Sequence, residues 1–250
     1  MTKKGSYHEK HRKANQDFIM HKEDDRYIAL SLADGVSSCK YAKKGAKIAC
    51  SVISEMLMNH AERFFEIDSN EAVCHILSKI KYELEKTAKN HDIEEYSSTL
   101  VCVLYDRIAN KVFYFSLGDS LIIAIKDKNC KIVAQPCDSR DGCYVTTTEN
   151  AEYLAKSGII DSDSIESIML CSDGAWNLMY NRGRIDSEIK YLLTGKRFDI
   201  LEKVLTEKNS IDDCSFISLN LSEFREEQKN GNKSIKQTKL PGRGRYCPLA

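Results

Sequence analysis

The stretch IMLCSDGAWN (168–177) places a short apolar run directly before an acid. The apolar half has the composition of a buried β-strand, and the chain then continues with Asp173 and Gly174. An Asp-Gly pair alone predicts only a turn. The pattern recurs in three other stretches: YIALSLADGVSS (27–38), VFYFSLGDS (112–120) and, with the acids before the strand, NSIDDCSFISLNL (209–221). Several apolar strands therefore begin or end at an aspartate.

These stretches, with the region before them, supply a set of aspartates at the edges of apolar segments: Asp17, Asp34, Asp119, Asp173 and Asp212. Carboxylates that converge at one rim of a sheet repel one another unless a cation neutralises them. Oxygen ligands without His or Cys suit hard ions such as Mg²⁺ or Mn²⁺, and Gly35 would let its carbonyl approach an ion. Spacing alone leaves two interpretations open, a shared metal site and a set of independent turns.

The order of the predicted elements indicates an α+β layered domain. Apolar residues at helical spacing predict antiparallel helices over 40–66 and 70–90, with Asn70 as the N-cap of the second. Short β-rich segments over 98–136 predict an antiparallel meander. The remaining predicted elements are a helix over 149–158, a strand over 167–171, helices over 185–195 and 197–208, and a strand over 214–221. Runs of strands with paired helices favour this class over a doubly wound sheet.

Composition excludes several classes of function. The 250 residues carry a formal net charge of zero, so nothing indicates a nucleic-acid or membrane partner. The cysteines form no C-x-x-C pair and the N-terminal stretch is polar, so we expect a cytoplasmic protein with reduced thiols. We also expect one domain over 1–224, followed by a basic and mobile tail over 225–250. His8 and His11 fall in a basic N-terminal leader, which we expect to be mobile as well.

Six short blocks decide between the two interpretations of the aspartates. They are HRKANQDF (11–18), LADGVSS (32–38), SSTLVCVL (97–104), FSLGDS (115–120), LCSDGAWN (170–177) and DDCSFISL (212–219). In this order the blocks resemble those of the metal-dependent protein phosphatases of type 2C, and the compact interval between Asp119 and Asp173 is similar to that of the shorter bacterial-type members. The resemblance extends from residue 12 to about residue 221.

The resemblance implies a fold and an activity. The fold is an αββα sandwich, in which two antiparallel β-sheets are flanked by pairs of antiparallel helices. The activity is hydrolysis of phosphoserine and phosphothreonine in proteins by a hydroxide that bridges two Mn²⁺ or Mg²⁺ ions and attacks phosphorus in line. Partners would be phosphorylated proteins and a cognate Ser/Thr kinase, and the protein would be a monomer that binds no nucleic acid and no membrane.

Site residues follow from the resemblance by position. Asp34 matches the aspartate that bridges both ions and holds the hydroxide, and Gly35 matches the residue that lends its carbonyl. Asp173 and Asp212 match ligands of the other ion, while Asp119 matches the acid that shares a third, weaker ion with Asp173. The last two matches are Asp17, which would order metal-bound waters, and Arg12, which would receive the substrate phosphate through its planar fork of donors.

Departures from the family pattern keep an alternative open. Ser37 and Ser38 replace glycines, Val36 replaces a histidine that some members carry, and Leu121 replaces a basic residue. The source of the leaving-group proton and the choice between Asp212 and Asp213 as ligand therefore stay open. The alternative is a pseudophosphatase that binds phosphoproteins without turnover. A two-metal nuclease is disfavoured by the neutral charge.

Overall fold

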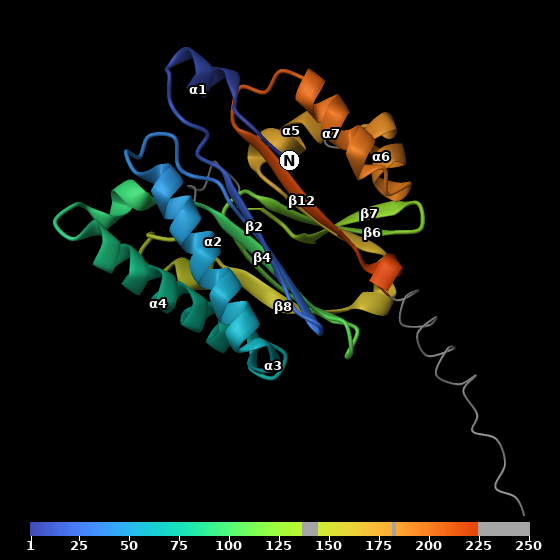
Figure 1. Cartoon of the computed structure of the whole chain (residues 1–250), viewed down its shortest axis with the longest axis horizontal. Helices are drawn as coiled ribbons and strands as arrows, with labels where there is room; N and C mark the ends of the chain where they lie inside the picture. Colours follow the sequence, from blue (N-terminus) through green and yellow to red (C-terminus); the bar gives the residue numbers. More distant parts are fainter. Residues whose placement is uncertain (137–144, 182–183, 225–250) are drawn as a thin grey trace, which may run out of the picture.

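The computed structural model describes residues 1–136, 145–181 and 184–224. They form two stacked antiparallel sheets with helices on both outer faces (Figure 1). In spatial order the first sheet contains β2 (Phe18–Glu23), β3 (Tyr27–Ala33), β4 (Leu100–Asp106), β5 (Lys111–Leu117) and β8 (Lys156–Asp161). The second contains β1 (Thr2–Lys3), β12 (Cys214–Asn220), β9 (Ser167–Cys171), β6 (Leu121–Lys126) and β7 (Asn129–Ala134). The predicted αββα sandwich is confirmed.

Helices cover the outer face of each sheet (Figure 1). On the first sheet lie α2 (Ala42–Asn59), α3 (Ala61–Phe64) and α4 (Ser69–Ala88), followed by the 3₁₀ turn η1 (Ile93–Tyr96). On the second sheet lie α5 (Asp173–Met179), α6 (Ser187–Thr194) and α7 (Phe198–Glu207). The smaller elements are α1 (Ser6–Lys10), η3 (Ala151–Tyr153), η4 (Ser162–Ser164) and the hairpin of β10 (Tyr180–Asn181) with β11 (Arg184–Ile185). No described helix has both the length and the apolar character that a bilayer span requires.

Strand periodicity explains why the core has three layers. Successive side chains of a strand point to opposite faces, so in β4 Leu100 and Cys102 pack under α2 and α4, whereas Val101 and Val103 pack between the sheets. The third layer joins the second sheet to α5, α6 and α7. Because the central strands are buried on both faces, they read as continuous apolar runs.

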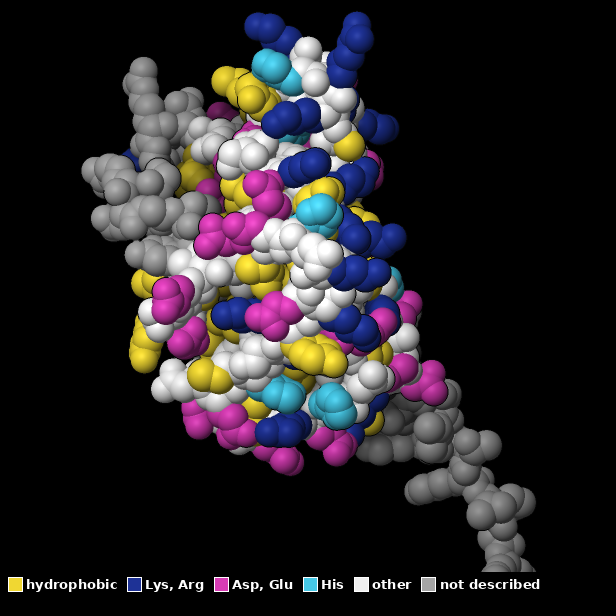
Figure 2. All heavy atoms as spheres, turned by 90° about the vertical axis from the view of Figure 1, so that its left-hand side faces the viewer, with side chains coloured by type: hydrophobic (Ala, Val, Ile, Leu, Met, Phe, Trp, Pro, Cys, Tyr) yellow, Lys and Arg dark blue, Asp and Glu magenta, His cyan; other side chains and the backbone are white. Residues whose placement is uncertain are grey.

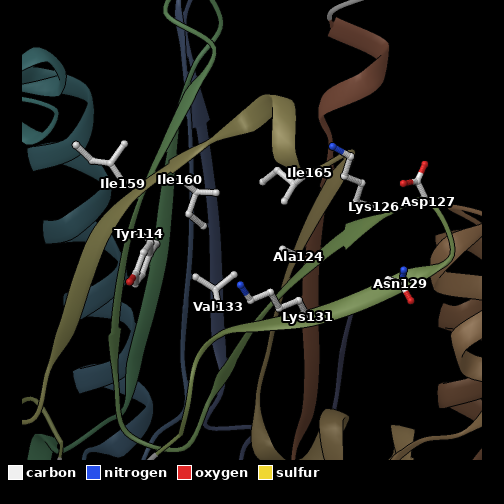
Figure 3. A pocket seen from close by; sticks show the side chains of 10 residues that line it. All are labelled: Tyr114, Ala124, Lys126, Asp127, Asn129, Lys131, Val133, Ile159, Ile160 and Ile165. Atoms are coloured by element: carbon white, nitrogen blue, oxygen red, sulfur yellow. The ribbon is translucent and has the colours of Figure 1, made fainter.

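The inter-sheet core opens at one edge into a cavity of about 450 Å³ (Figure 3). Tyr114 and Ile160 from the first sheet face Ala124 and Val133 from the second, and the side chain of Lys131 lies along this opening. None of the candidate metal ligands is among the described residues that line it. The cavity therefore belongs to the packing of the sandwich edge and is separate from the aspartate cluster.

The structure corrects four expectations about elements. The cap of α4 is Asp68, whose carboxylate accepts from the N–H groups of Asn70 and Glu71, so Asn70 itself lies in the first turn. The helix expected over 149–158 is the short η3 followed by strand β8. The expected meander is divided, because β5 and β6 lie in different sheets. The N-terminal leader is folded, with β1 paired to β12.

The tail expected from residue 225 lies outside the described residues.

Candidate metal centre

Asp34 directly follows β3, and two hydrogen bonds with Thr99 fix its backbone. The Asp34 N–H donates to Thr99 Oγ1 at 3.0 Å, and the Thr99 N–H donates to the Asp34 carbonyl at 2.8 Å. The next residue, Gly35, forms a β-bridge with Ser98 and packs so closely on α2 that a Cβ would lie 2.9 Å from Ala42. The glycine therefore lets the first turn of α2 approach the strand end.

Asp119 sits where the chain crosses from one sheet to the other. Gly118 has a φ of +99°, which an L-residue rarely adopts, and its α-carbon faces the Thr99 side chain. The Asp119 carbonyl accepts from Trp176 Nε1 at 2.9 Å, and Ser120 Oγ lies 2.9 Å from Thr99 Oγ1. Thr99 thus links the loop that carries Asp34 to the loop that carries Asp119.

Asp173 is the first residue of α5, and only Ser172 separates it from β9. The turn that the sequence predicts at this position is a short helix. A Cβ on Gly174 would lie 2.1 Å from the Asp213 carbonyl oxygen, so only glycine allows α5 to begin against residues 212–213. This close approach brings Asp173 beside Asp212, and the two carboxylates interact electrostatically.

Asp17 precedes β2 and is buried, with 5% of its surface exposed. The Ser172 hydroxyl donates to Asp17 Oδ2 at 2.9 Å, and the Asp17 N–H donates to Asn15 Oδ1 at 2.8 Å. The carboxyl groups of Asp17 and Asp34 lie close enough for each to affect the pKa of the other. Side chains from opposite sheets therefore meet at the rim where β2, β3 and β9 come together.

Burial and mutual repulsion raise the pKa values of these acids. Burial raises the pKa of Asp17 to about 7. It raises the pKa of Asp173 to about 6, with further contributions from Asp119 and Asp212. The pKa of Asp34 lies well above its ordinary value because of burial and the charges of Asp17 and Asp173. The pKa of Asp119 is raised by burial and by Asp212. The predicted aspartates are thus gathered within electrostatic reach of one another.

The donor set fits a divalent cation. Asp17 Oδ1 and Asp173 Oδ1 are buried, and neither has a hydrogen-bond partner among the described residues. No Lys or Arg is among the main causes of the pKa shifts of Asp17, Asp34, Asp119 and Asp173. Uncompensated carboxylates and unpaired oxygens are what a hard cation satisfies. In the part of the chain that the structure describes, no three His, Cys, Asp or Glu side chains already form a preassembled ligand group. The individual ligand assignments therefore remain predictions.

Asp212 and Asp213 have different surroundings. Asp213 is buried and accepts from the N–H groups of Gly5 and Gln16 at 2.8 and 2.6 Å. It also lies 2.8 Å from His8 Nδ1. Asp212 is half-buried and interacts with the carboxylates of the cluster. Geometry therefore favours Asp212 as the acid that faces a metal.

His8 is a residue near the site that the sequence did not reveal. It was expected in a mobile leader, but it is 1% exposed and pairs with Asp213. A single histidine in a basic stretch has no periodicity that would place it in a core. His11, by contrast, is exposed, and its Nδ1 lies 2.8 Å from the Tyr7 carbonyl.

Arg12 lies in the turn after α1, five residues before Asp17 in sequence. Its guanidinium is exposed and, among the described residues, has neither a hydrogen-bond nor an ion-pair partner. The structure does not bring it into contact with the aspartates. The neighbouring Lys13 donates from Nζ to the Ser37 carbonyl at 2.8 Å, which ties this turn to the loop after Asp34.

Comparison with known proteins yields a family and a set of related folds. A family model described as protein phosphatase 2C matches residues 4–207. A comparison with curated protein sequences returns no match.

Three solved structures illustrate the related folds. The serine/threonine phosphatase Stp1 from Staphylococcus aureus has a TM-score of 0.65 at 18% identity, over 88% of this chain and 92% of that chain. RsbX in complex with magnesium has a TM-score of 0.57 at 14% identity, over 87% and 91%. The catalytic domain of the phosphatase PstP in complex with two manganese ions has a TM-score of 0.59 at 11% identity, over 88% and 95%. At these identities the likeness shows a shared fold.

Proposed function

Because the chain belongs to the protein phosphatase 2C family, we propose that it hydrolyses phosphoserine and phosphothreonine in proteins with the help of Mg²⁺ or Mn²⁺. The observation that carries the proposal is the cluster of aspartates with raised pKa values and buried, unpartnered oxygens. Relatives of the same fold, in complex with magnesium or with two manganese ions, support the choice of metal.

Four of the five candidate aspartates have a role that their positions support. Two bound ions would neutralise the cluster and activate a water molecule for in-line attack on phosphorus. Asp34 interacts with Asp17, Asp173 and Asp212, so it would bind at the centre of the cluster. Asp173 and Asp212 would bind one of the two ions, and Asp119 would share a third, more weakly bound ion with Asp173.

Substrate binding would fall to Arg12. Its guanidinium is exposed, and a planar fork of donors can bind two phosphate oxygens at once. The contact of Lys13 with the Ser37 carbonyl keeps the turn that carries Arg12 beside the loop that follows Asp34. We therefore expect the Arg12 side chain to approach a phosphate group from the side of the loop that follows Asp34.

The test is Asp34→Asn, which keeps the shape of the side chain and removes its charge. Wild-type protein should hydrolyse an aryl phosphate when Mn²⁺ is added and lose this activity with a chelator. The variant should lose activity by about 10²-fold or more, the scale at which loss of one transition-state-stabilising group is felt. Mn²⁺ titration followed by calorimetry should show weaker binding by the variant.

Asp127→Asn is the matched control, because Asp127 is an exposed aspartate on the turn between β6 and β7. This variant should keep both Mn²⁺ binding and turnover. Full activity of Asp34→Asn would refute the central role of Asp34. Mn²⁺ binding by wild-type protein without turnover of any phosphate ester would favour the pseudophosphatase alternative.

A further inference from the structure

A row of unpaired cations borders the candidate metal centre. We call it the basic ridge; its members are Lys10, Arg12, Lys13, Lys40, Lys43, Lys44 and Lys47. Figure 2 shows that Lys and Arg side chains gather in a column over α1 and along α2. All members are exposed except Lys13, which is half-buried. Within residues 1–136, 145–181 and 184–224, none of them forms an ion pair with a carboxylate. This concentration of charge contrasts with the zero net charge of the chain.

The position of the lysines on α2 opposes helix stability. Lys43 and Lys44 lie in the first turn of α2, which contains no acidic residue. The N-terminus of a helix carries a partial positive charge, so cations there destabilise it. Lys43 and Lys47 are four residues apart on the helix, a spacing at which like charges repel. Stability of α2 alone would favour acids at these positions, so the lysines require another explanation.

Aromatic rings hold several of the cations in place. The ammonium groups of Lys40 and Lys44 lie 5.3 and 5.6 Å from the ring centroids of Tyr41 and Tyr96. These two rings are themselves stacked at 4.8 Å. Lys13 lies 5.7 Å from the centre of the Tyr7 ring. Cation–π contacts restrict the side chains without neutralising them, so less conformational entropy is lost when an anionic partner binds.

The ridge begins beside the aspartate cluster and leads away from it. Lys13 contacts the Ser37 carbonyl, three residues after Asp34. The chain from Gly35 to Tyr41 joins β3 directly to α2, where the other lysines follow. Two acids of η1 border the ridge on one side: the Glu95 carboxylate accepts from the Lys40 N–H at 2.6 Å, and Glu94 is next to it. A polypeptide whose phosphorylated residue reached the cluster could extend one flank along the lysines.

We propose that the basic ridge binds acidic side chains next to the phosphorylated residue of a protein substrate. This inference rests on the proposed function and specifies the substrate class. A peptide is favoured over a nucleic acid because the ridge begins beside a cluster of carboxylates and the chain as a whole is neutral, and both features disfavour a long polyanion. Acidic residues on one flank of the phosphate would contact the lysines and avoid the aspartates.

The experiment compares two phosphothreonine peptides that differ only in acidic or neutral flanking residues, together with an aryl phosphate. The variant Lys43→Glu/Lys44→Glu/Lys47→Glu reverses the charge of the part of the ridge that lies on α2 and leaves Arg12 unchanged. It should lower kcat/KM for the acidic peptide by about tenfold or more, mainly through KM, because several attractive charges become repulsive. Turnover of the neutral peptide and of the aryl phosphate should change by less than about twofold, since the neutral peptide has no acidic flanking residues and the aryl phosphate has no flanking residues at all.

The matched control is Lys81→Glu/Lys190→Glu/Lys203→Glu, which makes the same change in net charge at exposed lysines of α4, α6 and α7. It should leave the preference for the acidic peptide intact. That preference should also shrink when ionic strength rises from about 0.05 to about 0.5 M, because salt screens exposed charges.

Binding of the same peptides by fluorescence anisotropy, with a chelator present, separates the two proposals. If the wild-type protein turns over no substrate but still binds the acidic peptide more tightly, and the ridge variant loses this difference, the ridge proposal stands and the proposed function fails. Equal binding of both peptides would overturn the ridge proposal. Tighter binding of a single-stranded oligonucleotide than of the acidic peptide, lost in the ridge variant, would overturn it in favour of a nucleic-acid site.

Discussion

Asp212 and Asp213 differ by one position in sequence and occupy different environments. The backbone turns so that the Asp213 carboxylate points to Gly5, His8 and Gln16, which satisfy it. Asp212 instead lies near Asp34 and Asp173 and interacts electrostatically with both. The sequence predicts that one acid of this pair belongs to the site. Which of the two it is depends on the N-terminal segment, which contacts Asp213 from at least 197 residues away in sequence. Contacts between such distant residues produce no pattern in the local sequence.

At Asp17 the structure gives a pH prediction for the metal-free protein. The pKa in the folded state is about 7, above the ordinary value of 3.8, so between these values the folded state holds a proton that the unfolded state has lost. The contribution of the Asp17 carboxyl to the free energy of unfolding is therefore fully present below pH 3.8 and is lost as the pH rises through about 7. Asp17→Asn stays neutral, so the stability of wild type relative to this variant should fall over the same range.

Urea unfolding in chelator at several pH values across this range measures the difference. Affinity for Mn²⁺ should change in the opposite direction and rise with pH, because binding requires the carboxylates to lose their protons. A relative stability that is constant with pH would show that Asp17 is not buried among acids in the folded protein.

At the scale of elements, the crossing between β5 and β6 is the feature that builds the site. The sequence predicts both strands and the acid between them, but the short turn suggests a hairpin. In the structure β5 pairs with β4 and β8, and β6 pairs with β7 and β9. The apolar pattern of both strands fits either pairing, because both are buried on two faces. The pattern of residues 149–158 also fits two structures. Its apolar spacing predicts a helix, but the second half of the segment forms β8, which pairs with β5.

Gly118→Ala should disturb this crossing. Its φ is +99°, and an added Cβ would lie 2.7 Å from the Thr99 side chain. Strain at such a position costs about 1–3 kcal/mol, which corresponds to a fall in Tm of about 2–4 °C per kcal/mol for a chain of this size. Because Asp119 is the next residue and Thr99 holds the Asp34 backbone, Mn²⁺ binding should weaken as well.

Gly195→Ala is the control. Gly195 is exposed at the end of α6 with a φ of −82°, and an added Cβ would lie 3.1 Å from the Tyr191 carbonyl oxygen. Differential scanning calorimetry should find its Tm within about 2 °C of wild type. If Gly118→Ala were as stable as this control and bound Mn²⁺ equally well, the crossing would not be what positions Asp119.

At the scale of the whole molecule, the N-terminal segment connects regions that are far apart in sequence. Strand β1 pairs with β12, and the Met1 ammonium group donates to the Phe216 carbonyl at 3.0 Å. Farther along, the Gly5 N–H donates to Asp213, and a Cβ on Gly5 would lie 2.3 Å from the Asp212 backbone. The N-terminal segment therefore packs against the loop that carries the candidate ligand Asp212 and helps to hold it in place.

His8→Ala tests this support. The change removes a partner of the buried Asp213 carboxylate and leaves the N–H groups of Gly5 and Gln16. Loss of a hydrogen bond to a buried charged group costs about 1–3 kcal/mol, so metal-free protein should unfold at a Tm several degrees lower. Trypsin should also cleave faster after Lys10, Arg12 and Lys13, because undocking of α1 exposes the backbone around them. His8→Asn, whose amide can still donate, should recover part of the stability.

His11→Ala is the matched control, since His11 belongs to the same segment but is exposed and contacts only local groups. It should change the free energy of unfolding by no more than about 0.5 kcal/mol and leave the rate of cleavage near that of wild type. If both variants behaved alike, His8 would contribute nothing to the docking of the N-terminal segment, and the contacts of Gly5 and Gln16 would hold it without the imidazole. If only His8→Ala opened the segment, the placement of a candidate ligand near the end of the chain would depend on residues at its beginning.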